Sequence, residues 1–418
     1  MNNESKRWIL LVAGIIINIC AGFGYAWSVF QNPLMQQFGW NAIQASLAYT
    51  LVMGVSALPM ALVGMAQAYI SPRVLVFTGG LLLGGSVFFS GSIQSLAQLY
   101  LVYGVGVGLG VGIVYSGSLS NMVRFFPDKR GFCSGAMAAG MGSGAVILAP
   151  LAAALISNFG VMPSFRIIGI AFILIICGLS LLIDTAPQDY APMGWIPKKT
   201  TETLTGADKD WKAMLKDPIF YLMAGIFTTG TTSGVMIIGH ASPMFQEIMN
   251  FTPQKAAAML GFLALCNTLG RLFWGWTSDR IGRLKTIYFL YAITALALLG
   301  LIYFTGQYLF VVMVMFIGTC YGGFMSMIAS LTADTFGSKN LPINFGIMFL
   351  AYGFAAFIGP RMAAVIKIMN QGDYSPAFII AILMCLVGIV LNLVVVKKLT
   401  KRTACASSTE LLTHTANE

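Results

Sequence analysis

The stretch GWTSDRIGRLK at residues 275–285 is a short charged segment between two long apolar runs. A weaker copy, GMAQAYISPR at residues 64–73, begins 211 residues earlier and has Ala68 where the later copy has Asp279. Prolines repeat at nearly the same interval, with Pro150 and Pro360 standing 210 residues apart. An internal repeat of this length predicts that the chain consists of two similar halves.

The composition around these segments is that of a membrane protein. Hydrophobic residues make up 57% of the 418 residues and charged residues only 9%, whereas ordinary globular chains carry about 25% charged residues. Seven cysteines are scattered without a CxxC pair, so we expect no metal site, no cofactor and no disulfide framework. We interpret the net charge of +10 as the basic excess of cytoplasmic loops, and not as a nucleic-acid site.

Apolar runs long enough to cross a bilayer define the fold class. About 20 helical residues, rising 1.5 Å each, cross a hydrocarbon core of about 30 Å. We therefore expect an all-α membrane protein with twelve transmembrane helices in two six-helix pseudo-symmetric halves. The predicted spans are 8–30, 44–69, 73–92, 97–121, 132–158, 164–184, 217–240, 253–277, 284–304, 307–333, 342–368 and 375–397. The predicted domains are an N-terminal half at 1–184, a cytoplasmic central loop at 185–216, a C-terminal half at 217–397 and a cytoplasmic tail at 398–418.

The basic residues are distributed unequally between the two sides of the predicted bundle. Nineteen Lys and Arg residues fall on the side of both termini and three on the other side. Because basic residues accumulate in cytoplasmic loops, we expect a multi-pass protein of the bacterial inner (plasma) membrane with both termini cytoplasmic. The two remaining basic residues, Arg271 and Arg361, fall within spans.

Arg271 is the strongest candidate for a binding residue. It precedes Asp279 by eight residues, which places it about 12 Å into the bilayer. A guanidinium at that depth costs several kcal/mol unless it faces a polar cavity, and its planar fork of donors suits a carboxylate. Because the fourteen Asp and Glu residues fall in loops, tails or helix ends, we expect an external anion to be its partner.

Four stretches resemble a known family. The loop at 275–285 is similar to the G-x-x-x-D-R-x-G-R loop of the major facilitator superfamily. GYAWSVFQNP at 24–33, GVGIVYSGSLSNMVRFFPDKRG at 110–131 and NTLGRLFWGWTSDRIGRLK at 267–285 resemble its oxalate/formate antiporter family, which includes bacterial monocarboxylate transporters. The resemblance covers essentially the whole chain. It implies a major facilitator fold, a monomer, and a substrate-binding arginine at Arg271.

The resemblance also suggests the walls of the binding site. Tyr25, Tyr115 and Tyr321 match positions where the family has cavity aromatics. Oxalate carriers use a second cation, a lysine, at the position that is Tyr352 here. Since a dianion would then lose one counter-charge, we expect a monocarboxylate. Animal monocarboxylate carriers have an aspartate where this chain has Asn267. We expect Asn267 and Tyr352 to line the binding site together with the three tyrosines.

Two further residues have open roles. His240 lies near the outer end of the seventh span, shortly before Pro243. Because histidine changes charge near neutral pH, its role is either structural or in proton sensing or gating. Arg361 follows Tyr352 by nine residues, which places it on the opposite helix face. We expect Arg361 to be a snorkelling or packing residue, with a role as second substrate ligand as the alternative.

A separate charged set lies in the loops on the side of the termini. We expect it to make ion pairs that hold that face closed, with orientation by positive charge alone as the alternative. Its members are Asp128, Arg130, Asp279, Arg280 and Arg283.

These observations predict a secondary active transporter. We expect it to move a small monocarboxylate (lactate, pyruvate or formate) by alternating access, by proton symport or anion exchange. The alternatives are an oxalate/formate-type dicarboxylate antiporter and, from another class, a transport-inactive sensor or an anion channel. An enzyme is not expected, because no buried acid, base or metal cluster is evident.

Overall fold

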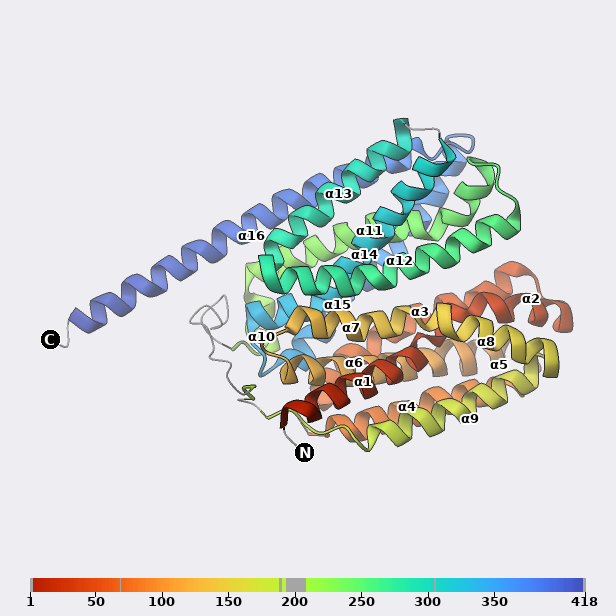
Figure 1. Ribbon diagram of the computed structural model, residues 1–418, viewed down its shortest axis with the longest axis horizontal. Coiled ribbons are helices and arrows are strands. Elements are labelled where there is room, and N and C mark those ends of the chain that lie inside the picture. The colour runs from red at the N-terminus through yellow and green to blue at the C-terminus, as the bar shows by residue number, and fades with distance from the viewer. Residues whose placement is uncertain (1–2, 68, 188–189, 193–207, 304–305, 416–418) are drawn as a thin grey trace.

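The computed structural model describes residues 3–67, 69–187, 190–192, 208–303 and 306–415. Throughout this part of the chain the regular structure is helical, and twelve helical stretches are long and apolar enough to span a membrane. The predicted fold class and number of spans are confirmed. Both termini lie at the same end of the bundle (Figure 1), called the terminal end below.

The first six spans use eleven helical elements, because several spans are broken. The first span is α1 (Asn3–Ala21), η1 (Gly22–Ala26) and α2 (Trp27–Phe38), and the fourth is α5 (Leu96–Gln98), the π-helix η2 (Leu99–Val107) and α6 (Gly108–Phe125). The fifth is α7 (Arg130–Gly142) and α8 (Gly144–Phe159). The unbroken spans are α3 (Ala42–Ala66), α4 (Pro72–Ser90) and α9 (Val161–Ser180).

The second six spans are continuous helices. A short helix, α10 (Trp211–Lys216), precedes them. They are α11 (Pro218–Glu247), α12 (Pro253–Ile281), α13 (Arg283–Tyr303), α14 (Gln307–Phe336), α15 (Leu341–Met369) and α16 (Ser375–Thr415). Two of them extend well past their predicted ends: α11 continues beyond Pro243 to Glu247, and α16 extends through much of the predicted tail to Thr415.

Local signals in the sequence explain where these helices begin and end. The side chains of Asn41, Ser71 and Thr252 accept the N–H three residues ahead, which satisfies an otherwise free donor of the first turn. Glycines follow the last residues of α12 and α14, with φ of +95° at Gly282 and +91° at Gly337, a conformation that glycine adopts without steric cost.

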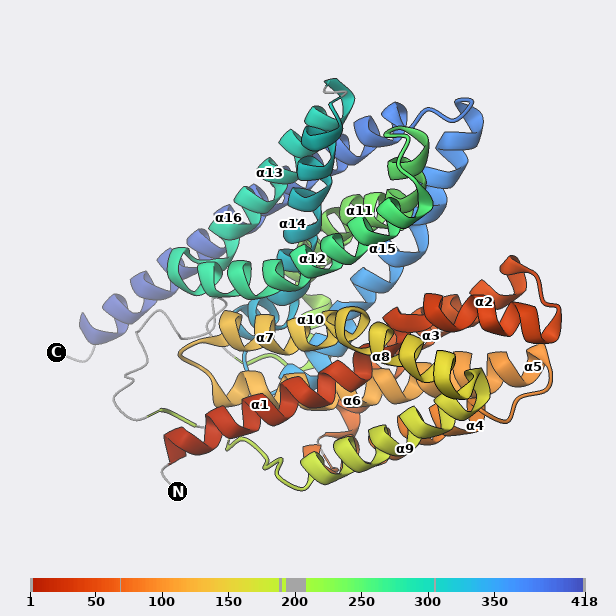
Figure 2. The same cartoon turned by 45° about the vertical axis from the view of Figure 1, so that its right-hand side comes forward.

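The two halves meet along close helix pairs. In Figure 2 they converge toward the terminal end and diverge away from it. The two glycines that begin the repeated loop segments make these contacts: Gly64 of α3 abuts the start of α15, and Gly275 of α12 abuts Gly131 of α7. A Cβ on Gly64 or Gly275 would lie 2.4 Å or less from backbone atoms of the other half, so only glycine allows this approach.

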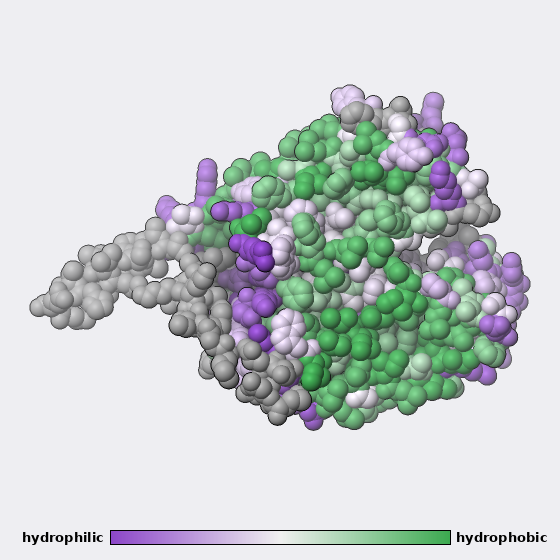
Figure 3. All heavy atoms as spheres, viewed as in Figure 1, coloured by the Kyte–Doolittle hydropathy of each residue, from purple (hydrophilic) through white to green (hydrophobic). Residues whose placement is uncertain are grey.

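The surface matches a membrane-spanning protein. In Figure 3, hydrophobic side chains cover the middle of the visible face, and hydrophilic ones gather at its two ends. The same view shows a notch between the halves at the end away from the termini. The halves therefore pack together at the terminal end and separate toward the opposite one.

Asp217 anchors the start of the second half at the terminal end. Its carboxylate accepts the N–H of Ile219 and pairs with Lys209 and Arg402. Burial alone would raise the pKa of Asp217, but hydrogen bonds from Arg402, Lys209 and the Ile219 backbone outweigh it and hold that pKa well below its usual range. A depressed folded-state pKa means that the stabilisation is present at neutral pH and is lost as pH falls through the acid range.

Replacing Asp217 with alanine is therefore expected to destabilise the protein by about 2 to 4 kcal/mol, because a helix cap and the charged hydrogen bonds from Lys209 and Arg402 disappear. Thermal unfolding of purified protein in detergent measures this. Asp210→Ala, which removes the cap of the short exposed helix α10, is the matched control and should change the midpoint little. Equal shifts in the two variants would refute the anchoring role.

Candidate functional site

Arg271 lies in the middle of α12, at the interface between the halves, and is only 3% exposed. Its Nε donates to Asn267 Oδ1 one turn earlier, at 3.3 Å, and its Nη1 donates to the carbonyl of Ala138 in α7. None of the ion pairs among the described residues includes Arg271. A buried guanidinium held by neutral oxygens alone retains an uncompensated charge.

Tyrosine hydroxyls surround this charge. Tyr115 of α6 and Tyr321 of α14 are buried and lie within electrostatic range of Arg271 and of Tyr25, which occupies the 3-10 break η1 in the first span. The break frees the backbone of η1 from regular helix geometry at the level where Tyr25 faces the other half. Residues from four different spans thus converge on one point between the halves.

The remaining predicted wall residue is in the same group. Tyr352 of α15 is within hydrogen-bonding range of Tyr321. The ring of Phe349 lies between Tyr115 and Tyr352, with centroid distances of 6.1 and 5.0 Å. The structure therefore brings together all six residues that the sequence proposed for substrate binding, and adds Phe349 as an apolar wall.

Tyr49 of α3 is a member of this group that the sequence reasoning missed. It interacts electrostatically with Tyr25, Tyr321 and Tyr352. No charge or motif marks this tyrosine in an apolar span, and only its position after folding shows it. Among the described residues, no three His, Cys, Asp or Glu side chains come close enough to hold a metal ion.

His240 and Arg361 lie apart from the tyrosine group. His240 Nε2 contacts the carbonyl of Pro360 at 3.0 Å, and its ring packs on Tyr374. Arg361 is exposed and stacks on the ring of Phe357, 4.1 Å from its centroid. The exposed side chains of Phe354, Phe357 and Val365 lie on the same face of α15 as Arg361.

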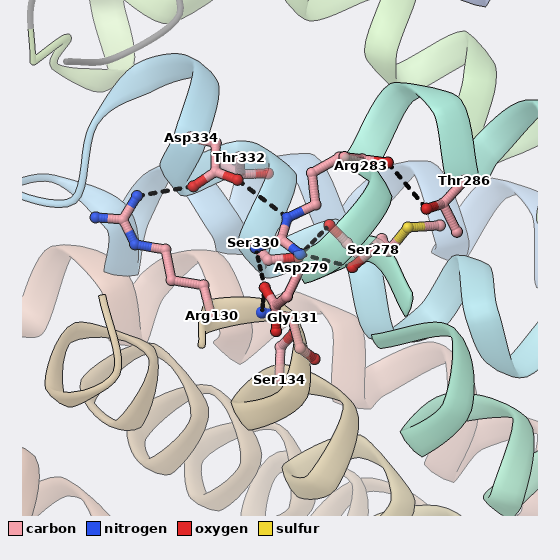
Figure 4. Close-up of polar contacts among 12 residues, drawn as sticks. Arg130, Gly131, Ser134, Ser278, Asp279, Arg283, Thr286, Ser330, Thr332 and Asp334 are labelled. Carbon is pink, nitrogen blue, oxygen red and sulfur yellow. Dashed lines mark hydrogen bonds and ion pairs between the residues drawn. The ribbon is translucent and has the colours of Figure 1, made fainter. Parts of the chain in front are cut away.

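A network of charged side chains joins the halves at the terminal end (Figure 4). The Asp279 carboxylate accepts the N–H groups of Gly131 and Phe132 at 2.9 and 2.7 Å. These donors form the first turn of α7, where the helix dipole favours a negative charge. Arg283 pairs with Asp279 at 2.6 Å and with Asp334 at 3.0 Å.

Asp334 completes this network, because Arg130 of the first half also binds it, at 2.8 Å. Sequence reasoning did not select Asp334, which falls just past the predicted end of its span. Two residues of the predicted set lie outside the network. Asp128 pairs with Arg7 within the first half, and Arg280 stacks on Trp276.

The fold and this interface define a class, a two-halved multi-pass membrane protein with an ion-paired closure and a central cationic site. Comparison with known families shows which family of such proteins the chain matches. The family model described as Major Facilitator Superfamily matches residues 12–360 and 264–413. The chain therefore belongs to the Major Facilitator Superfamily, and is a transporter of that superfamily.

Individual relatives and structures agree with this assignment. The chain is 28% identical to the oxalate:formate antiporter of Oxalobacter formigenes, over 94% of this chain and 92% of that protein. It is 24% identical to monocarboxylate transporter 12 of Rattus norvegicus, over 95% and 87%. The solved structure of the proton:xylose symporter XylE superposes with a TM-score of 0.72 at 13% identity, covering 94% of this chain and 96% of that chain.

The network predicts that neutralising Asp334 opens the terminal end. Asp334→Asn should cost about 2 kcal/mol of closure, because the Arg130–Asp334 ion pair across the halves loses its negative charge. Spin labels at positions 129 and 339, both exposed and one in each half, report the separation by pulsed paramagnetic resonance. We expect Asp334→Asn to add a population at longer distance.

Asp128→Asn is the matched control, because its ion pair lies within one half. It should leave the distance distribution of the parent protein unchanged. If the two variants behave alike, the network does not hold the halves together.

Proposed function

We propose that this protein is a secondary active transporter that carries a small monocarboxylate, such as lactate, pyruvate or formate, by alternating access. The observation that carries the proposal is the buried Arg271, whose side chain has only neutral oxygens as partners in the described part of the chain. A carboxylate would neutralise it and receive parallel hydrogen bonds from its planar fork. The surrounding hydroxyls of Tyr25, Tyr115 and Tyr321 offer further donors.

The number of cations supports a monoanion. Arg271 is the basic residue among the tyrosines, and Tyr352 occupies the place where the resemblance suggests a lysine in oxalate carriers. Arg361 lies on an exposed apolar face and stacks on Phe357, which supports a snorkelling role for it. Phe349 adds an apolar surface that suits a short carbon chain.

The proposed setting is the bacterial inner membrane, with both termini cytoplasmic. The basic excess at the terminal end supports this orientation. The ion-paired closure would then be cytoplasmic, and the site would be reached from outside. Asn267 stands where animal monocarboxylate carriers have an aspartate. Anion exchange needs no proton carrier in the protein, whereas proton symport would have to carry the proton on the substrate, on His240 or on another group.

The second candidate is a dicarboxylate antiporter, favoured by the similarity to the oxalate:formate antiporter. It requires a second cation at the site, which Arg361 would have to supply from the other face of α15. Exchange of oxalate for formate in vesicles that do not take up lactate would favour this candidate over the monocarboxylate carrier.

Uptake of radiolabelled L-lactate into proteoliposomes tests the proposal. It is measured with an inward proton gradient and, separately, with internal lactate and no gradient, and it should be blocked by excess pyruvate or formate. Arg271→Ala and Arg271→Lys should each reduce uptake by at least about thirtyfold, because a buried charged hydrogen bond is lost. Arg361→Ala is the matched control and should retain uptake. Parental uptake by either Arg271 variant, at equal protein in the vesicles, would exclude the proposed site.

A further inference from the structure

We infer that Arg271 is also a latch: its bond to the Ala138 carbonyl holds the terminal end closed in the empty protein, and the substrate carboxylate releases it. The inference rests on the proposed function for the identity of the releasing ligand. It concerns how binding is coupled to the change of access, which the binding site alone does not explain.

The latch lies in a continuous seam between α7 and α12. Gly131, Gly135, Ala138 and Gly142 are spaced by four, three and four residues, and therefore lie on one face of α7. A Cβ on Gly135 would lie 2.4 Å from the backbone oxygen of Arg271, and one on Gly142 would lie 3.0 Å from its Cζ. The seam extends from the Asp279 contacts at the terminal end to the guanidinium in the middle of the protein.

Arg271 makes the innermost polar contact of this seam. Of its two side-chain hydrogen bonds, the one to Asn267 stays within α12, whereas the one from Nη1 to Ala138 crosses to the first half. Closure along the seam thus ends at the group that is proposed to bind the substrate. A change in the partner of Nη1 changes the attachment of the two halves directly.

The chemistry of the competing acceptors favours release on binding. A carboxylate that binds the two terminal nitrogens of the fork competes with the Ala138 carbonyl for Nη1. Although this nitrogen has two N–H donors, the bond to Ala138 is lost when the guanidinium turns to aim both terminal nitrogens at the carboxylate. Hydrogen bonds from a guanidinium to a carboxylate are roughly twice as strong as those to a neutral carbonyl. In an α-helix the Ala138 carbonyl also accepts the N–H of Gly142, so its release leaves no unpaired buried group. The exchange therefore favours the carboxylate.

A cysteine at position 134 reports the state of the seam. Ser134 is 1% exposed, and its hydroxyl donates to the carbonyl of Ser326 in the other half. In a chain whose seven native cysteines are replaced, Ser134→Cys should react slowly with N-ethylmaleimide. L-lactate, pyruvate or formate should raise that rate by about tenfold, the equivalent of one charged hydrogen bond.

Variants at the latch give the decisive comparison. Arg271→Ala should raise the alkylation rate about tenfold without any carboxylate and abolish the response to carboxylates. Gly142→Ala keeps the guanidinium but crowds it away from Ala138, so the basal rate should rise while the carboxylate response persists. Arg361→Ala should match the parent in both respects.

The outcomes separate this inference from the proposed function. The latch is overturned if Arg271→Ala and Gly142→Ala both leave the alkylation rate without carboxylate unchanged, whatever the transport result. If the protein takes up lactate but its alkylation rate does not change when lactate is added, the latch is also overturned, and the transport proposal stays intact. Raised basal rates in both variants, with a carboxylate response in the parent, support it.

Discussion

A positive charge in the middle of a membrane protein is the constraint on which this structure depends. The guanidinium of Arg271 is buried between the halves, and its hydrogen bonds go to the amide oxygen of Asn267 and the carbonyl of Ala138. Such oxygens satisfy the donors but do not neutralise the charge. The arrangement is stable enough to fold, because an amide oxygen, a carbonyl and tyrosine hydroxyls lie near it, and yet it favours an anion that reaches the site.

The charged side chains of the network at the terminal end differ from Arg271, because they have partners of opposite charge. In that network each acid has a basic partner: Asp334 pairs with Arg130 across the halves and with Arg283 within the second half, so its charge is compensated there. The deep charge and the paired charges lie on the same α7–α12 seam, with glycines allowing the helices to touch. A single rigid seam therefore carries the closing contacts at one end and the binding charge at the other, which suits a carrier that exposes one side at a time.

The sequence predicted the number of spans, because hydropathy is a strong signal. It also proposed a set of residues around a deep arginine that the structure places together, because a charge within a span is a strong signal too. It did not reveal the breaks in the first and fourth spans or the extension of α11 past Pro243, since neighbouring helices satisfy the backbone there. Tyr49 carries no charge or motif that separates it from other aromatics. Asp334 and the Ala138 carbonyl acquire their contacts across the halves from arginines more than a hundred residues away.

The most direct test of the central claim is a calorimetric titration of the purified protein with L-lactate and with lactamide, its uncharged analogue of similar shape. The account predicts saturable binding of lactate, no binding of lactamide, and loss of lactate binding in Arg271→Gln with the protein still folded. Binding of lactate by Arg271→Gln as tightly as by the parent, or equal binding of lactamide, would contradict the claim that the buried guanidinium is the anion site.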